Sequence, residues 1–328
     1  MDDNKKKIDW LAVLQGFSML LVVIGHVSLT NQPGDPNTPI ATGIEATIYT
    51  FHMPLFIFVS GWLFYYTCIS RGKSYKKMLE SKTKRLLIPF FVFTVLTMVL
   101  KMVFPQLMHR VVDINEIIDT FIFYRSNPLG EMWFIVVLFE LMLLYPLYKI
   151  MTESVTMSVI GLGGALGLSH FFPAISYFYL GNVAYMLPFF VLGIFCCRYD
   201  LRIIIEKVWF LLVMTVLFVF CNILEMLPES MKVETALVGT LFCMSLCLTV
   251  AKYLPNLFHS FRDYTYQIFL IGIFFQMPIR WIYVKTGNEM IFVPMWFLSV
   301  LIGVYFPTTI AKAIKKYAPP RLRLCFGL

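Results

Sequence analysis

Two histidines lie within long apolar stretches of this 328-residue sequence, and imidazole is the side chain best suited to move a proton near neutral pH. His26 lies near the end of the apolar run 8–29, and His52 lies in the run FHMPLFIFVSGW. Ionisable groups inside such runs usually face a cavity or a partner. The pair therefore indicates general acid–base chemistry, and the alternative for each is a side chain that only reaches the membrane surface.

Other polar residues lie at a corresponding depth of further apolar runs, namely Lys101, Glu131 and Asn182. Gln15 lies eleven residues before His26. Eleven helical steps return to within about 20° of the same direction, so these two side chains share one helix face and lie roughly 16 Å apart along the axis. Singly, each polar residue has an ordinary structural explanation. Together with the histidines they predict a polar layer in the outer third of the membrane.

A second group of polar residues is basic and lies at the opposite end of an apolar run. Arg85 begins the run RLLIPFF, and Lys82 and Lys84 precede it. One interpretation is a binding site for an anionic group such as a nucleotide phosphate. The alternative is plain anchoring of a cytoplasmic helix end by positive charge. Glu140 lies inside another apolar run and requires a partner that the sequence does not identify.

Several well-known catalytic motifs are absent from the sequence. There is no G-x-S-x-G, H-E-x-x-H or G-x-x-x-x-G-K-[ST] pattern, and no G-x-G-x-x-G follows a predicted strand. The seven cysteines lie in apolar runs or predicted cytoplasmic segments. Cys243 and Cys247 share a helix face, but no run of His or carboxylate residues lies near them. We therefore expect free thiols and no metal site.

The elements that must position these residues are membrane-spanning helices. Hydrophobic residues make up 59% of the chain and charged residues 14%, whereas soluble domains carry roughly 25% charged residues. A bilayer-spanning segment of about 20 apolar residues must be helical, because it satisfies its own backbone hydrogen bonds. The sequence predicts an all-α bundle of about ten spans, at 8–29, 44–66, 86–107, 131–150, 155–171, 176–197, 208–226, 234–252, 264–284 and 291–312.

The distribution of basic residues predicts the orientation of these spans. With the N-terminus inside, the cytoplasmic segments hold 21 of the 27 Lys and Arg residues, as the positive-inside rule requires. Both termini are then cytoplasmic. The net charge of +8 comes from basic residues that lie in short runs between apolar stretches, as membrane topology predicts, so we expect no nucleic-acid partner. The loops are short, and we predict one domain, 1–328, in a multi-pass protein of the plasma membrane (the bacterial inner membrane).

Four stretches of the sequence together resemble one known family. They are LQGFSMLLVVIGH, which ends at His26, FHMPLFIFVSGWLF around His52, KRLLIPFF, and MWFIVVLFELMLLYPL. In these stretches the chain resembles the acyltransferase 3 family, bacterial membrane acyltransferases that modify surface glycans. Two positions depart from the family's pattern. Gln15 stands where Arg or Lys is usual, and Gly272 stands where a late helix commonly has His.

The resemblance implies an O-acyltransferase that takes its acyl group, most often acetyl, from an acyl-CoA arriving from the cytoplasm. The acceptor would be a hydroxyl of a glycan or glycolipid. His26 would remove the proton of that hydroxyl, and His52 or Glu131 would orient or assist it. The residues predicted to face the oxyanion or the acceptor are Lys101, Asn182 and Trp133. The residues predicted to contact the acyl donor are Arg85, Lys84 and Gln15.

Two other functions remain open at this stage. Ten helices with ionisable residues also suit a transporter or flippase of a glycan or lipid-linked precursor. Gln15 and Gly272, as departures from the family's pattern, also suit a non-catalytic partner of a polysaccharide synthase. The sequence predicts neither the acceptor nor the oligomeric state.

Overall fold

The chain is helical throughout the part that its structure describes. The computed structural model describes residues 2–27, 29, 36–103, 130–173, 175, 177–223 and 231–328, and these ranges contain no β-strand. The all-α class predicted from the sequence is therefore confirmed. The contacts divide the chain into two compact units, Met1–Val59 with Leu201–Ala318, and Ser60–Asp200 with Pro319–Leu328.

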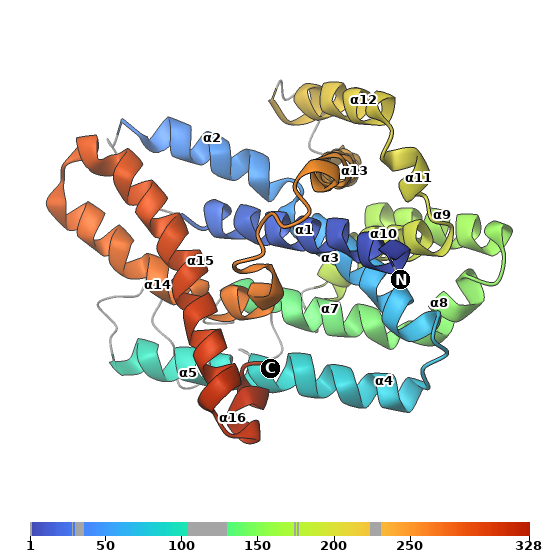
Figure 1. Ribbon diagram of the computed structural model, residues 1–328, viewed down its shortest axis with the longest axis horizontal. Helices are drawn as coiled ribbons and strands as arrows, with labels where there is room; N and C mark the ends of the chain where they lie inside the picture. The colour runs from blue at the N-terminus through green and yellow to red at the C-terminus, as the bar shows by residue number, and fades with distance from the viewer. Residues whose placement is uncertain are drawn as a thin grey trace. The chain divides into compact units, whose positions relative to one another are not determined.

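The first unit is built from long helices of both ends of the chain. Its helices are α1 (Asp2–Gly25), α2 (Thr38–Tyr49), the first part of α3 (His52–Phe64), α11 (Arg202–Ile205), α12 (Val208–Phe218), α13 (Lys232–Tyr253), α14 (Thr265–Thr286) and α15 (Phe292–Tyr317). A π-helical turn, η7 (Val219–Ile223), follows α12, and the 3₁₀ turns η9 (Arg262–Tyr264) and η10 (Glu289–Ile291) precede α14 and α15. Figure 1 shows α14 and α15 lying side by side.

The hydrophobic core of the first unit joins α1 to α14 and α15. Its buried members recur at three- and four-residue spacing, which places them on one face of each helix. They include Met19, Val22 and Val23 of α1, Ile268, Ile279 and Tyr283 of α14, and Val300 and Val304 of α15. The buried amide of Gln276 donates a 3.0 Å hydrogen bond to the carbonyl of Val23. This bond ties α14 to the last turns of α1.

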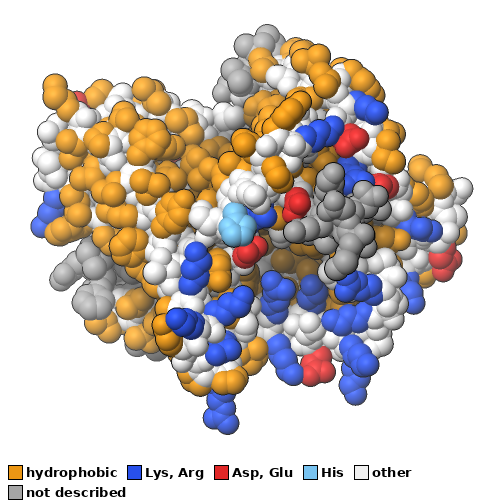
Figure 2. Space-filling model, viewed as in Figure 1, with side chains coloured by type: hydrophobic (Ala, Val, Ile, Leu, Met, Phe, Trp, Pro, Cys, Tyr) orange, Lys and Arg blue, Asp and Glu red, His pale blue; other side chains and the backbone are white. Residues whose placement is uncertain are grey.

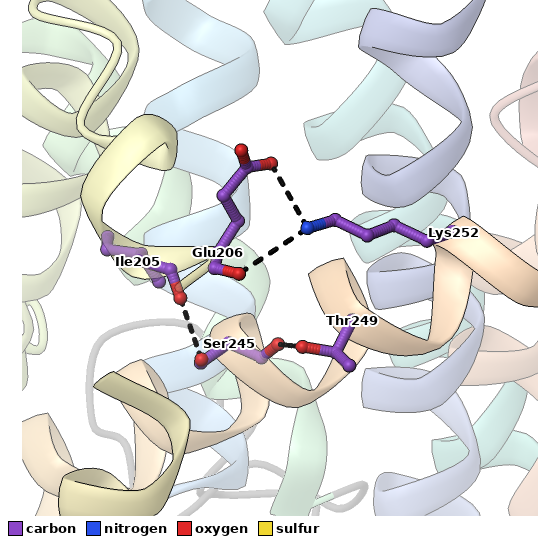
Figure 3. A network of polar contacts seen from close by, with 5 residues as sticks. All are labelled: Ile205, Glu206, Ser245, Thr249 and Lys252. Carbon is purple, nitrogen blue, oxygen red and sulfur yellow. Dashed lines mark hydrogen bonds and ion pairs between the residues drawn. The ribbon is translucent and has the colours of Figure 1, made fainter. Parts of the chain in front are cut away.

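A polar network fixes the short helix α11 against α13, as Figure 3 shows. The buried hydroxyl of Ser245 donates a 2.7 Å bond to the carbonyl of Ile205. Seven residues later on α13, Lys252 lies 3.8 Å from the carboxylate of Glu206. The buried bond carries most of the stabilisation, because exposed ion pairs contribute about 0–1 kcal/mol.

The second unit contains the central helices of the chain. They are the rest of α3, the π-helical turn η1 (Tyr65–Ile69), α4 (Tyr75–Lys82), the π-helical turn η2 (Thr83–Leu87), α5 (Ile88–Val103), the 3₁₀ turn η6 (Gly130–Met132), α7 (Trp133–Leu143), α8 (Tyr145–Met151), α9 (Val155–Phe171), α10 (Leu180–Arg198) and α16 (Pro320–Cys325). Phe64, Tyr148 and Phe190 pack as an aromatic cluster, with ring centroids 5.3 to 6.2 Å apart. Gly61 lets α3 approach the backbone of Phe190 closely.

Within the described ranges, six helical segments are long and apolar enough to cross a membrane: Thr38–Ile69, Tyr75–Leu100, Leu180–Arg198, Lys232–Tyr253, Arg262–Thr286 and Glu289–Tyr317. A bent pair, Gly130–Leu143 with Tyr145–Met151, turns by 56° and can make a seventh. The remaining predicted spans correspond to three shorter apolar helices, Asp9–Gly25, Val155–Phe171 and Val208–Asn222. The structure thus supports a multi-pass membrane protein with about six candidate spans.

The exposed surface of individual helices agrees with lipid as their surroundings. On α12, Leu212 is 62% and Val216 is 68% exposed, and α12 itself has no buried residue. On α9, Val159 and Ile160 are similarly exposed. Aliphatic side chains in such numbers on one helix face are stable against hydrocarbon, not against water.

Candidate active site

The predicted span 44–66 is interrupted at the residues that precede His52. Helix α2 ends at Tyr49, α3 begins at His52, and Pro54 lies in the first turn of α3. Proline is tolerated there because first-turn backbone N–H groups have no helical acceptor. The end of α2 leaves carbonyl groups without helical donors. One of them, that of Ile48, accepts a 3.2 Å bond from the backbone N–H of Phe51.

The same carbonyl fixes the tautomer of His52. The Nδ1 atom of His52 lies 2.8 Å from the oxygen of Ile48. A carbonyl only accepts, so Nδ1 carries a proton and donates it. In the neutral ring, Nε2 then holds a lone pair. The imidazole is 2% exposed, so it is a buried group in a defined orientation.

His26 directly follows α1 and contacts the end of α2. Its backbone N–H continues the helical pattern with a 3.1 Å bond to Val22. Its Nδ1 atom lies 2.7 Å from the hydroxyl oxygen of Tyr49, within hydrogen-bonding distance. Gly25 permits this approach, because a Cβ atom at that position would lie 3.2 Å from the Tyr49 ring and from Ile48.

The three rings form one cluster within the first unit. The ring centroids of His26 and His52 are 6.3 Å apart, those of His26 and Tyr49 are 5.8 Å apart, and those of Tyr49 and His52 are 4.8 Å apart. Tyr49 is 46% exposed and His26 is half-buried, whereas His52 lies beneath them. Of the two imidazoles, His26 is therefore the more accessible, and His52 is buried.

Helices α12 and α13 hold the α2–α3 junction in place. Phe51 is buried against Gly239, where a Cβ atom would approach the Phe51 ring to 2.6 Å, and its ring lies 5.4 Å from that of Phe218. Beside it, the hydroxyl of Thr50 donates a 2.5 Å bond to the side-chain carbonyl of Asn222. These contacts fix the residues directly before His52, so the buried imidazole has little freedom to move.

The two positions that depart from the family's pattern also lie in the first unit. Gln15 is half-buried on α1. Gly272 lies where α14 packs on α15, and a Cβ atom there would lie 3.1 Å from the carbonyl oxygen of Gly303. Close helix packing therefore explains glycine at this position, and a histidine would need α14 and α15 to separate.

The predicted donor-binding residues Lys84 and Arg85 lie in η2 of the second unit. A π-helical turn inserts one extra residue into a helix and is frequent at functional sites. Lys84 pairs with Glu80 at 2.6 Å, and both side chains are more than half exposed. Arg85 is exposed and makes no hydrogen bond or ion pair with a described residue. Figure 2 shows lysine and arginine side chains gathered over α4, which directly precedes η2.

The other predicted site residues also belong to the second unit. Glu131 lies in η6, and one of its carboxylate oxygens is buried without a hydrogen-bond partner among the described residues. Trp133 begins α7 and is half-buried, and Asn182 lies half-buried in the first turn of α10. Lys101 belongs to α5, and its side chain lies outside the described residues. The histidines are thus the predicted residues that the structure brings into one cluster, and the roles of all of them stay predictions.

Tyr49 is the member of the cluster that the sequence did not single out. It lies three residues before His52, which was a signal that could have been used. Its contact with His26, however, depends on how α1 packs against α2. Among the described residues, no group of three or more His, Cys, Asp or Glu side chains is arranged to hold a metal ion.

Comparison with known proteins identifies a family. The family model of acyltransferase 3, described as an acyltransferase domain, matches residues 8–312. No curated protein and no solved structure matches the chain.

Proposed function

The chain belongs to the acyltransferase 3 family, and from this membership we propose that it moves an acetyl group from acetyl-CoA to a hydroxyl of a cell-surface or lipid-linked glycan. Membership supports a membrane acyltransferase in general. The donor and the acceptor are part of the proposal. The observation that carries it is the cluster of His26, Tyr49 and His52, in which a half-buried imidazole is held by its Nδ1 atom.

The proposed reaction needs one base and no redox step. Nε2 of His26 takes the proton of the acceptor hydroxyl while that oxygen attacks the thioester carbonyl carbon. The tetrahedral intermediate collapses as the C–S bond breaks, and the CoA thiolate leaves with the electron pair and takes up the proton that Nε2 of His26 had removed, which restores the neutral imidazole. The products are an O-acyl ester and CoA–SH. General acid–base assistance of this kind contributes roughly 10²–10⁴-fold in rate.

The remaining predicted residues take supporting roles in the proposal. His52 or Glu131 orients or assists the base, and a donor among Lys101, Asn182 and Trp133 meets the oxyanion or the acceptor. On the donor side, Arg85 binds a phosphate of CoA through its planar guanidinium, assisted by Lys84. Gln15 cannot add positive charge, so we propose that it contacts the donor by hydrogen bonding alone.

The proposal also includes the topology of the chain. We place both termini in the cytoplasm and the protein in a bacterial plasma membrane with about ten spans. The three shorter helices and the bent pair, added to the six candidate spans, support this number. Fusing a green fluorescent protein after Leu328 tests the C-terminal side, because this protein becomes fluorescent in the cytoplasm. A dark but stable fusion overturns the orientation.

The activity is tested with purified protein in proteoliposomes. Radiolabelled acetyl-CoA is supplied with glycolipid extracted from a strain that lacks the protein, and label in the glycan is measured. His26→Ala should lower transfer by at least roughly 10²-fold. His170→Ala is the control, because the ring of His170 bonds the Leu166 carbonyl of its own helix and is exposed on α9. Equal transfer by wild type and His26→Ala contradicts the assignment.

A transporter is a second candidate, favoured by the bend between α7 and α8. Discontinuous helices with an ionisable residue often mark a transport site. Here the 56° break follows Glu140, one of whose carboxylate oxygens is buried without a partner among the described residues. The same proteoliposomes separate the two functions. Label in the glycan without an imposed gradient supports transfer, whereas glycolipid movement without acetylation supports transport.

A further inference from the structure

Two consecutive residues at the end of α2 hold both imidazoles by the same ring atom. The carbonyl of Ile48 lies 2.8 Å from Nδ1 of His52, and the hydroxyl of Tyr49 lies 2.7 Å from Nδ1 of His26. Both Nε2 atoms are thereby left outside these two contacts. The last turn of α2 thus acts on the orientation of both rings.

We propose that Tyr49 is a positioning residue that holds His26 as the Nδ1–H tautomer, so that the lone pair on Nε2 can accept the acceptor's proton. This inference rests on the proposed function and adds a residue to it. Tyr49 acts through His26 and does not itself exchange a proton with the substrate. The observation behind the proposal is the 2.7 Å contact between the tyrosine hydroxyl and Nδ1 of the imidazole, and the proposal assigns the imidazole as its donor.

The contact between Tyr49 and His26 matters because the tautomer of the imidazole decides whether Nε2 can act as a base. When Nδ1–H donates to the oxygen of Tyr49, Nε2 is unprotonated and able to act as a base. When the tyrosine donates instead, Nδ1 is the acceptor, and the proton on Nε2 blocks the base. A base must hold the correct tautomer and direction before the reaction starts, as a histidine in a catalytic triad does.

Packing explains why Tyr49 can perform this role although 46% of its surface is exposed. Its ring lies 4.8 Å from the buried imidazole of His52, and Gly25 lets the ring lie against the end of α1. Two contacts therefore hold the ring, and the hydroxyl has a defined position. A tyrosine that only marked the membrane surface would not need an imidazole within hydrogen-bonding distance.

The test is Tyr49→Phe, which keeps the ring and removes the hydroxyl. We expect kcat for acetyl transfer to fall by roughly 10- to 100-fold, as for loss of a group that orients a catalytic residue, with KM for acetyl-CoA within about twofold. Tyr305→Phe is the matched control, because Tyr305 is 44% exposed and its hydroxyl lies 3.4 Å from Ser260, away from the imidazoles. It should transfer at the wild-type rate.

A spectroscopic measurement separates positioning from a structural effect. In full-length protein labelled with ¹⁵N at histidine, the ring shifts of His26, assigned by its absence in His26→Ala, report the tautomer. We expect Nδ1–H in wild type and a mixture with Nε2–H in Tyr49→Phe. A wild-type ring protonated at Nε2 overturns the proposal, and so does an unchanged kcat in Tyr49→Phe. If the wild type transfers no acetyl group, the proposed function is overturned. The spectrum still tests the tautomer of His26 in that case, because it does not depend on acetyl transfer.

Discussion

The imidazole cluster of the first unit and the basic turn of the second are built in opposite ways. The three rings belong to the residue after α1, the last residue of α2 and the first of α3, namely His26, Tyr49 and His52, and each ring contacts the other two. Lys84 and Arg85 are neighbours in one π-helical turn, and both are exposed. Lys84 has an acidic partner one turn away, whereas Arg85 has no described one. The imidazole cluster depends on contacts between separate segments of the chain. The residues of the basic turn are close together because they are neighbours in the sequence.

The difference corresponds to what each proposed chemistry requires. Proton transfer needs a heavy-atom distance of about 2.6–3.2 Å and a fixed tautomer, so its residues must be held in place. Binding a phosphate needs positive charge, which acts over about 8–10 Å at physiological salt. Substitutions in the cluster should therefore depend on geometry, and those in the basic turn should depend on charge.

Among these predictions, the largest effect on kcat is expected from a substitution of His52 that keeps the role of Nδ1 and removes Nε2. The amide of Asn can replace Nδ1–H as a donor to Ile48, but it has no group at the position of Nε2. If His52 assists the base through Nε2, His52→Asn should lower kcat roughly 10²-fold while the protein keeps its melting temperature. His170→Asn, which changes an equivalent bond on α9, should leave kcat unchanged. Full activity of His52→Asn would reduce His52 to a structural role.

A smaller effect, on the free energy of unfolding, is expected at Gly272, where α14 packs on α15. Gly272→His adds an imidazole at a position where even a Cβ atom would lie 3.1 Å from the Gly303 carbonyl oxygen. Overpacking of this kind costs typically 1–3 kcal/mol. The melting temperature in detergent should fall, and kcat should fall with it because α14 bonds to α1 at Val23. Gly163→His is the control, since its Cβ atom would meet no atom within 4 Å. Equal melting temperatures would contradict the packing explanation.

In the basic turn, the effect should follow charge. Arg85→Ala should raise KM for acetyl-CoA by about tenfold, the equivalent of about 1.4 kcal/mol, while kcat stays constant. Arg85→Lys keeps the charge and should recover most of this loss. Lys84→Ala should have a smaller effect, because Lys84 is paired with Glu80. A fall in kcat for Arg85→Lys would show that this turn also depends on geometry and would break the distinction between the two regions.

The smallest expected effect is that of salt. Raising the salt concentration from about 0.1 to 1 M shortens the screening length from about 10 to 3 Å, so KM for acetyl-CoA should rise in the wild type. The rise should be smaller in Arg85→Ala, whereas His26 and His52 variants should keep the wild-type salt dependence of KM. A salt dependence that is the same in Arg85→Ala and wild type would remove Arg85 from the donor site.

The sequence alone determined the features that depend on local composition. Apolar runs of 17 to 23 residues required helices, so the all-α class followed without reference to packing. The spacing of Gln15 and His26 predicts one shared helix face, because helix geometry is regular. The family followed from stretches around His26, His52 and Trp133.

Tertiary structure decided which of these residues meet. The break between Tyr49 and His52 frees the Ile48 carbonyl for an imidazole, and the approach of α1 to α2 brings Tyr49 to His26. The first contact is local, because it joins residues four apart in the sequence. The second joins residues 23 apart, and nothing in the local sequence indicates it. Gly272 is explained in the same way, by the carbonyl of Gly303 on the neighbouring helix. A regular helix fixes where its own side chains point, but only packing fixes what lies opposite them.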